Sequence, residues 1–538
     1  MPTKLATIAL GRRVDALFAR YTQPGSPGAV VGIMRGGEIE LCKGYGLASV
    51  ELGVPITPRT RFRIASVSKQ FTVTAALMLA GEGLLKLSDP PHAYLKELAP
   101  LPVTIDQMMR NSSGLPDFLE LLRLGGHGLD RPARAADLFA ACVLNNHLNF
   151  APGSRFLYSN TNFLLLGRII EKLTKKKLGD VLRERIFKPL GMDQTMLAAD
   201  IDTVIPNLAT GYLGDAATGF RRAAHAYPQG GEGGLTSTVE DLLIWSRHFD
   251  APVLGKALPA QLAAAAPLTG GHDNRYRRGV GVGDVHGLAT VGHGGLWPGF
   301  RTEFLRVPAA DLTIVVIANL GSIDPWRLAH TIAADALAGD KRLKPALDPI
   351  TEAEIKPLAG TWFNAAEPSL FELAWKNGEA IVTQNGLPFV LGRRAGGWFG
   401  AERGSFEFMI KAGPGKSNGG GLRVDLGAGR VLTFKKLGKR KAVPAAIAGI
   451  FSSPDTGAAW HVRRGGVDTT IAVYGPLVSS SEPWVVNGID GDTVEIVSPG
   501  GWIKATQLAH LERDKAGKIA ALVVSTGRIK NMRFERTG

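Results

Sequence analysis

The stretch FRIASVSKQFT, residues 62–72, opens an apolar segment and places Ser66 three positions before Lys69. Residues at positions i and i+3 share one face of a helix, so Lys69 can reach the Ser66 hydroxyl. The N–H groups at a helix start favour negative charge, and burial there makes a lysine easier to deprotonate. The same spacing is also typical of a helix cap followed by a surface lysine. Ser66 is therefore a candidate nucleophile and Lys69 its candidate base, and other motifs must decide.

A second motif, Tyr158-Ser159-Asn160, lies directly before another apolar segment. A phenol beside a lysine can pass a proton to a leaving group, and an amide can hold a substrate backbone. An aromatic side chain packed next to an Asn helix cap would give the same pattern. The motif gains weight from its position after the serine and lysine.

A third motif, His293-Gly294-Gly295, indicates the edge of a strand. Its glycines would let a substrate lie against the strand, and the N–H of Leu296 could pair with that of Ser66 as an oxyanion hole. A His-Gly-Gly by itself is most often a turn. The three motifs in this order favour acyl transfer on a serine far more than any one of them does.

Other chemistries find little support in the sequence. The 11 histidines show no HExxH motif or clustered ligand spacing, so we expect no metal and no cofactor. The glycine-rich run GVGVGD, residues 279–284, has no helix after it and predicts a strand of small residues rather than a nucleotide-binding loop.

The composition narrows the class of protein further. The net charge of +14 is spread along the chain, and its densest clusters, 175–177 and 435–441, accompany no nucleic-acid module, so no nucleic-acid partner is expected. Cys42 and Cys142 are too few for a disulfide framework. The first residues lack the apolar core of a secretion signal, and no apolar run is long enough for a membrane span. These features predict a soluble, cytoplasmic protein.

Residues 1–340 mix strand and helix patterns. Segments 30–34 and 312–319 are rich in β-branched residues and predict buried strands. Helical patterns cover three segments, 71–85, 161–173 and 238–249. This mixture predicts an α+β domain in which helices pack on an antiparallel sheet.

The pattern changes after a linker at 341–357, which is rich in proline and charge. Short strands and glycine-rich turns follow, and LAGTWF, which contains Gly360, is repeated as IAGIF around Gly449. The spacing of the repeat predicts two antiparallel β-barrels of about 90 residues each. We place the first barrel at 358–443 and the second at 444–538.

The motifs resemble the serine β-lactamase/penicillin-recognising superfamily in its class C-like branch, over roughly residues 8–340. Three longer strings carry the likeness: 44–69 before and around the serine, RNSSGLPDF at 110–118, and GEGGLTSTVEDL at 231–242. The resemblance implies a β-lactamase-like domain in which Ser66 is the nucleophile and Lys69 the base. It also implies that Tyr158 relays protons and that Asn160 contacts the substrate amide.

The chain departs from this family at the third motif, where Lys-Thr-Gly is common. His293 supplies a weaker, titratable charge and Gly294 supplies no hydroxyl, which weakens recognition of a substrate carboxylate. This departure and the two C-terminal, lipocalin-like barrels resemble the D-aminopeptidases of the superfamily. The resemblance implies a homodimeric exopeptidase that recognises a free ammonium and releases N-terminal D-amino acids from small peptides and amino-acid amides.

The resemblance also implies that a loop of the last barrel gates the active site, and segment 475–492 is the candidate. Asp490, in slight preference to Glu482, would then pair with the substrate ammonium, and Asn274 is a possible second contact. A class C-like esterase, or a D-alanyl-D-alanine carboxypeptidase or β-lactamase with the same nucleophile, remains open. So does a non-catalytic scaffold on an inherited fold.

Overall fold

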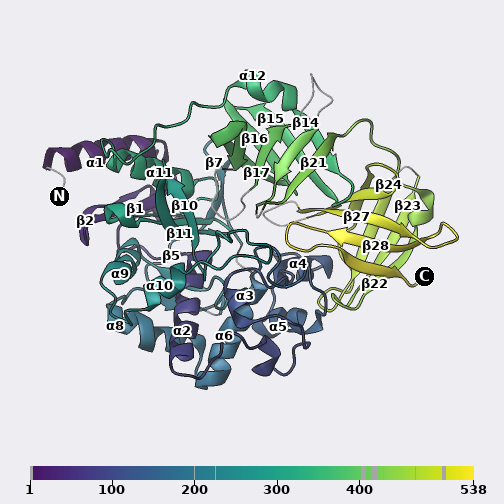
Figure 1. The fold of residues 1–538 in the computed structure, drawn as a ribbon, viewed down its shortest axis with the longest axis horizontal. Coiled ribbons are helices and arrows are strands. Elements are labelled where there is room, and N and C mark those ends of the chain that lie inside the picture. The colour runs from purple at the N-terminus through teal and green to yellow at the C-terminus, as the bar shows by residue number, and fades with distance from the viewer. Residues whose placement is uncertain are drawn as a thin grey trace.

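The computed structural model describes residues 4–198, 200–224, 226–401, 408–413, 421–427, 429–466, 468–499 and 505–538. A helix-covered sheet, purple to teal in Figure 1, is followed by two β-barrels in green and yellow. The barrels lie next to each other on one side of the N-terminal domain (Figure 1). The α+β architecture with two C-terminal barrels is thus confirmed.

The N-terminal domain is built on a six-stranded antiparallel sheet. Its strands, in spatial order, are β10 (Gly281–Val285), β11 (Leu288–Trp297), β12 (Phe300–Val307), β13 (Leu312–Ala318), β1 (Ala29–Arg35) and β2 (Glu38–Tyr45). The predicted strands at 30–34 and 312–319 are the buried β1 and β13. The run at 279–284 contributes to β10, as its small residues predicted.

Side chains on a strand alternate between the two faces of a sheet, and here both faces carry apolar side chains that helices cover. Val31 and Ile33 of β1 pack in the core beneath α1 (Lys4–Phe18) and α11 (Pro325–Ala336). Val30 and Met34 face the larger core that contains α2 (Lys69–Gly81), α6 (Thr161–Thr174) and α9 (Val239–Asp250). These last three helices are the predicted ones, although α2 begins two residues earlier and ends at Gly81, before the left-handed Gly83.

Shorter elements complete the domain. The helices are α3 (Ile105–Met109), α4 (Phe118–Leu124), α5 (Ala135–Leu144), α7 (Leu178–Leu182), α8 (Lys188–Leu190) and α10 (Leu258–Ala263). The strands are β3 (Leu47–Ser49), β4 (Val54–Pro55), β5 (Phe62–Arg63), β6 (Met196–Leu197), β7 (Tyr212–Asp215), β8 (Gly219–Arg222) and β9 (Leu235–Ser237).

Each barrel closes from eight antiparallel strands. The first has β14 (Gly360–Asn364), β15 (Ser369–Lys376), β16 (Glu379–Gln384), β17 (Leu387–Arg394), β18 (Trp398–Ala401), β19 (Met409–Ala412), β20 (Leu422–Asp425) and β21 (Val431–Lys436). The second has β22 (Gly449–Ser453), β23 (Ala458–Gly465), β24 (Asp468–Tyr474), β25 (Trp484–Gly488), β26 (Thr493–Ser498), β27 (Ala505–Arg513), β28 (Ile519–Ser525) and β29 (Met532–Arg536).

The sequence repeat marks equivalent positions of the two barrels. Gly360 begins β14 and Gly449 begins β22, with φ values of 122° and 152° that favour glycine. The predicted linker is not wholly separate from the first barrel. Its second half forms the short helix α12 (Glu352–Ile355), and Ile355 is buried in that barrel's core.

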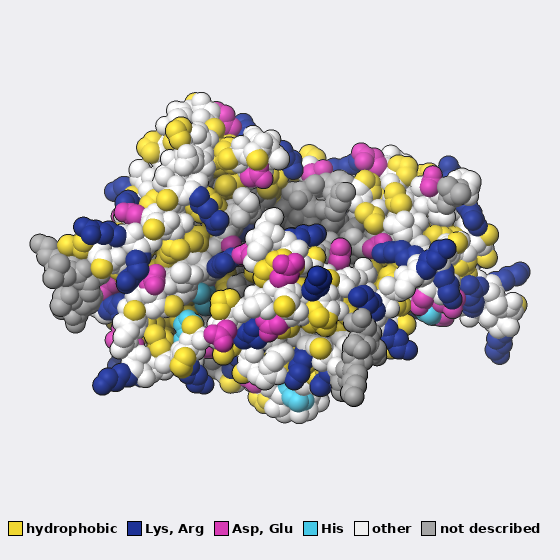
Figure 2. Space-filling view, turned by 90° about the horizontal axis from the view of Figure 1, so that it is seen from above, with side chains coloured by type: hydrophobic (Ala, Val, Ile, Leu, Met, Phe, Trp, Pro, Cys, Tyr) yellow, Lys and Arg dark blue, Asp and Glu magenta, His cyan; other side chains and the backbone are white. Residues whose placement is uncertain are grey.

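Two surface properties bear on the possible partners. On the face in Figure 2, Lys and Arg side chains are scattered among Asp and Glu across the molecule. Of the helices in the described ranges, none has the length and apolar character that crossing a membrane requires.

Candidate active site

Ser66 lies in a strained turn between a short strand and the central helix. Strand β5 pairs with β9 and leads into the 3-10 turn Ala65–Ser68, which precedes α2. Ala65 is buried with a φ of 48°, a left-handed conformation that costs energy for a non-glycine residue. Gly295 of β11 packs against this turn so closely that a Cβ would overlap the Ile64 carbonyl oxygen. The glycine is thus needed to place the nucleophile turn against the strand.

Lys69 is the central polar group of the site. Its Nζ donates hydrogen bonds to Ser66 Oγ at 2.9 Å, to Asn160 Oδ1 at 2.8 Å and to the Glu232 carbonyl oxygen at 2.6 Å. Burial lowers the pKa of Lys69 to about 7. At neutral pH a neutral lysine is therefore available to accept the Ser66 proton.

Tyr158 lies close to two basic side chains. Lys69 Nζ is 4.9 Å from the centre of the Tyr158 ring, and Arg528 Cζ lies at 4.9 Å from the same centre. The Tyr158 hydroxyl has no hydrogen-bond partner among the described residues, and burial raises the pKa of this phenol. Tyr158 therefore keeps its proton at neutral pH and can donate it.

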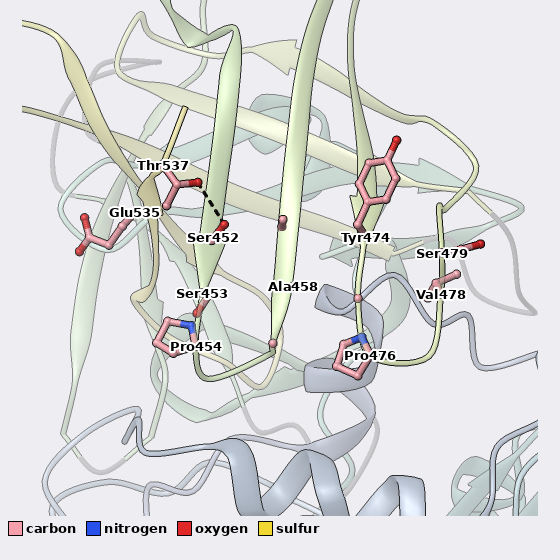
Figure 3. Close-up of a pocket in the computed structure, with 13 residues that line it drawn as sticks. Ser452, Ser453, Pro454, Ala458, Tyr474, Pro476, Val478, Ser479, Glu535 and Thr537 are labelled. Atoms are coloured by element: carbon pink, nitrogen blue, oxygen red, sulfur yellow. Dashed lines mark hydrogen bonds between the residues drawn. The ribbon is translucent and has the colours of Figure 1, made fainter.

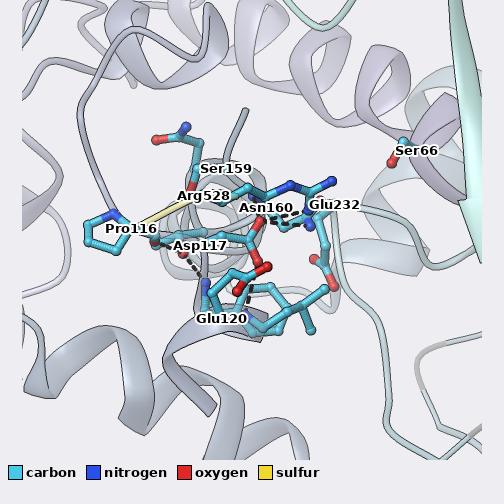
Figure 4. Close-up of polar contacts among 12 residues, drawn as sticks. Ser66, Pro116, Asp117, Glu120, Ser159, Asn160, Glu232 and Arg528 are labelled. Atoms are coloured by element: carbon cyan, nitrogen blue, oxygen red, sulfur yellow. Dashed lines mark hydrogen bonds and ion pairs between the residues drawn. The ribbon is translucent and has the colours of Figure 1, made fainter. Parts of the chain in front are cut away.

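Asn160 connects Lys69 to a buried carboxylate. Its backbone N–H and its Nδ2 donate to Asp117 Oδ2 at 2.8 and 2.9 Å, while its Oδ1 accepts from Lys69. Figure 4 shows Asn160 and Arg528 close together beside Asp117. In this structure Asn160 orients the base, and its predicted contact with a substrate amide stays a prediction.

His293 is buried and both ring nitrogens are engaged. Nε2 lies 2.9 Å from the Tyr276 hydroxyl and Nδ1 lies 2.6 Å from the Gly294 carbonyl oxygen. Burial and the nearby Lys69 lower the pKa of His293 to about 3, so the ring is neutral at physiological pH. The third motif supplies shape and hydrogen bonds there, not the titratable charge expected from the sequence.

Asn274 lies one layer behind His293. Its Nδ2 donates to the Arg110 carbonyl oxygen at 2.9 Å, and its Oδ1 accepts from the Tyr276 N–H at 3.1 Å. Asn274 therefore orients Tyr276, the partner of His293, and it does not line the cavity at Ser66.

The structure does not bring Asp490 or Glu482 to Ser66. Asp490 Oδ1 accepts the N–H groups of Asp492 and Thr493 within its own turn, and Glu482 is exposed beside Arg131. No residue of segment 475–492 lines the cavity. The hairpin that starts the segment instead packs on the end of α4, where a Cβ at Gly475 would overlap the Gly125 carbonyl oxygen. Figure 3 shows a second, separate hollow at this hairpin, lined by Pro454, Pro476 and Val478.

A cavity of about 240 Å³ opens beside Ser66 and is lined by all three domains. The N-terminal domain contributes Tyr158, Asn160, Gly294, Gly295 and Leu296, among others. The first barrel contributes Gln384, Asn385, Leu387 and Phe389, and the second contributes Thr506, Gly527 and Arg528. The predicted nucleophile and its neighbours thus come together at one cavity, which the second barrel reaches through an unforeseen segment.

Acidic residues that the sequence did not single out line this cavity, among them Glu120, Glu232 and Glu303. Glu303 of β12 pairs directly with Gly294 of β11, and its Oε2 lies 3.0 Å from where a Cβ at position 294 would be. A hydroxyl-bearing side chain therefore does not fit at 294 unless Glu303 moves. Burial raises the pKa of Glu303 well above its ordinary value.

The chain is similar in sequence to D-aminopeptidases and in fold to a penicillin-binding protein homologue. The D-aminopeptidase of Gluconobacter oxydans (strain 621H) is 32% identical over 327 residues, 60% of either chain, and that of Brucella anthropi is 33% identical over 320 residues, 59% of either chain. The chain thus aligns with only about three fifths of the length of these relatives. The octameric penicillin-binding protein homologue from Pyrococcus abyssi has a similar fold, with a TM-score of 0.55 and 20% identity over 94% of this chain and 100% of its own. A profile of the Beta-lactamase family matches residues 14–338, which is more than half of the sequence, and the chain therefore belongs to the Beta-lactamase family.

Proposed function

We propose that the protein is a serine hydrolase that releases N-terminal D-amino acids from peptides and D-amino-acid amides through an acyl-enzyme on Ser66. The observation that carries the proposal is the 2.9 Å contact between Lys69 Nζ and Ser66 Oγ at the edge of a cavity. Because the pKa of Lys69 is lowered to about 7, this lysine can act as a base at neutral pH.

The chemistry proceeds in two steps. Neutral Lys69 takes the Ser66 proton while Oγ attacks the substrate carbonyl, and the N–H groups of Ser66 and Leu296 are the proposed oxyanion donors. The proton then passes, with Tyr158 as relay, to the leaving amine as the C–N bond breaks. In the second step water attacks the acyl-enzyme and gives a proton to Lys69. Lys69 passes this proton to Ser66 Oγ as the bond between the acyl group and Oγ breaks, which releases the amino acid and restores Ser66 and neutral Lys69.

The preference for a free ammonium rests on the charges around the cavity. His293 is neutral and Gly294 has no hydroxyl, so two groups that would bind a substrate carboxylate are missing here. The Glu303 carboxyl on the neighbouring strand lies next to Gly294, where such a hydroxyl would be. An entering ammonium would favour the ionised form of this acid and pair with it, whereas the acid offers a substrate carboxylate no opposite charge. The proposed preference for D-amino acids is inferred from the relatives named D-aminopeptidase.

The test is a substrate panel with serine variants. Ser66→Ala should reduce turnover of D-alanine p-nitroanilide on the order of 10⁶-fold, as loss of a serine nucleophile does elsewhere. Ser68→Ala is the matched control: the Ser68 hydroxyl accepts the Leu235 N–H, so this variant should lose stability but keep turnover. A Ser66→Ala variant that stays active would contradict the mechanism.

The same panel separates the alternative functions. N-acetyl-D-alanine p-nitroanilide, L-alanine p-nitroanilide, p-nitrophenyl acetate, a D-Ala-D-Ala peptide and a chromogenic β-lactam complete it. Preference for the acetylated, carboxylate-bearing or ester substrates would favour the carboxypeptidase, β-lactamase or esterase. Failure of a fluorophosphonate to label Ser66, together with no turnover, would favour the non-catalytic scaffold.

A further inference from the structure

A short turn of the second barrel reaches into the cavity beside the proposed base. Residues 526–531 connect β28 to β29, and Gly527 and Arg528 of this turn line the cavity together with Ser66 and Asn160. The turn belongs to a different barrel segment from the gating candidate at 475–492. It gives the second barrel a direct contact with the catalytic machinery.

The turn is held in place by the N-terminal domain. Asn149 Nδ2 donates to the Arg528 carbonyl oxygen at 3.0 Å and Asn149 Oδ1 accepts the Lys530 N–H at 2.7 Å. His147 Nε2 lies 2.6 Å from the Lys530 carbonyl oxygen. Within the turn, Thr526 Oγ1 accepts the N–H groups of Arg528 and Ile529. These bonds fix the backbone from which the Arg528 side chain extends.

A larger contact supports the same docking. The indole of Trp460 in β23 donates to the Leu124 carbonyl oxygen at 2.9 Å, and Leu121 and Leu124 of α4 lie in the core of the second barrel. Because α4 begins directly after Asp117, this contact also fixes the position of that carboxylate.

Arg528 makes two contacts at the active site. Its Nη1 lies 3.1 Å from Asp117 Oδ2, and its guanidinium stacks over the Tyr158 ring. The same Asp117 oxygen accepts the two Asn160 bonds described above, and Asn160 Oδ1 accepts from Lys69. Figure 4 shows Arg528, Asp117 and Asn160 in contact. The Asp117 side chain is fully buried and would be an uncompensated charge without the arginine.

We propose that Arg528 is a positioning residue of the active site: through Asp117 it holds Asn160 against Lys69, so that the second barrel completes the catalytic machinery of the N-terminal domain. The inference rests on the proposed nucleophilic role of Ser66 but not on the identity of the substrate.

The charges around Lys69 determine in which direction its pKa should change when Arg528 is removed. Glu232, whose own pKa is raised by burial, and Asp117 raise the pKa of Lys69 when they are ionised, and the Arg528 guanidinium lowers it. The neighbouring Tyr158 and His293 are neutral near pH 7. Removing Arg528 takes away a cation and leaves Asp117 uncompensated, and both changes raise the pKa of Lys69.

The experiment follows labelling of Ser66 by an uncharged alkyl fluorophosphonate from pH 5 to 9 in the full chain. The labelling rate should fall at low pH, where Lys69 becomes protonated, and this fall is the acid limb of the profile. Arg528→Met should move the acid limb to higher pH by about one unit, so that labelling at a pH well below the pKa of Lys69 becomes about tenfold slower. Arg528→Lys keeps the charge and should restore the limb. In Asp117→Asn/Arg528→Met both charges are absent, so the limb should return toward that of the wild type.

The control is Arg533→Met, a change of the same kind at an exposed side chain of β29, which should leave the profile unchanged. Thermal unfolding of each variant separates lost folding from lost positioning, and Arg528→Lys decides if Arg528→Met does not fold. A wild-type limb and rate in Arg528→Met, or a rate loss that is equal at every pH and not rescued by lysine, would overturn the inference. A wild-type chain whose Ser66 is not labelled would instead overturn the proposed function.

Discussion

The pKa of Lys69 should set the pH dependence of catalysis near neutrality. The pKa is lowered from its ordinary value of 10.5 to about 7 by burial. About half of the Lys69 side chains are then neutral at pH 7, whereas a lysine with the ordinary pKa would be neutral in about one molecule in 3,000. The environment of Lys69 is therefore worth about a thousandfold in available base. Because a lowered pKa leaves the neutral form in excess above it, the rate should fall tenfold per pH unit below pH 7.

The assay is kcat/KM for p-nitrophenyl acetate from pH 5 to 9, because this substrate has no group that titrates there. Lys69→Arg should abolish the reaction, since a guanidinium does not give up its proton in this range. His293→Gln should keep the limb, because the pKa of His293 is about 3. A limb that disappears in His293→Gln, or a Lys69→Arg variant with more than a tenth of the wild-type rate, would refute the assignment of the base.

Two further predictions test the surroundings of the site. Glu232→Gln should move the same acid limb to lower pH, because the Glu232 carboxyl raises the pKa of Lys69; an upward shift in the ester profile would contradict this electrostatic picture. Gly475→Ala should destabilise the docked second barrel by about 1–3 kcal/mol, because the added methyl overlaps the Gly125 carbonyl oxygen. Gly465→Ala on the same barrel meets no neighbouring atom, so its melting temperature in calorimetry should stay near that of the wild type, and equal losses in the two variants would count against the contact.

Local patterns in the sequence were sufficient to predict most of the fold. The β-branched runs of β1 and β13 and the apolar period of α6 and α9 depend on neighbours a few residues away. The repeat at Gly360 and Gly449 was readable because each barrel needs a glycine with positive φ at the start of its first strand. The nucleophile motif could also be recognised from local sequence, because Ser66 and Lys69 are three residues apart and contact each other across one turn.

The missed residues depend on contacts between distant parts of the chain. Arg528 and Asp117 are 411 positions apart in the sequence, and no local pattern around either residue predicts that they pair. Asp117 had one available signal, because it directly precedes the helix α4 as an N-cap. The gating hypothesis for Asp490 came from the family resemblance and from the length of segment 475–492, and neither tells in which direction the loop packs. The hairpin packs on α4, and the shorter turn at 526–531 reaches the cavity instead.

The charges that line the cavity favour a cationic substrate group. Three arginines line the cavity, and each has partners within the protein. Arg528 is paired with Asp117 and Arg123 with Glu120 at 3.1 Å each, while Arg301 Nη1 donates to the carbonyl oxygens of Trp297 and Phe300. Among the described residues no hydrogen-bond or ion-pair partner reaches the Glu303 carboxyl, whose pKa is raised by burial. A neutral Glu303 avoids the cost of a buried charge while the cavity is empty. An entering ammonium would lower that pKa and ionise the acid, so that binding of a free amino group would release a proton, whereas binding of its acetylated analogue would not.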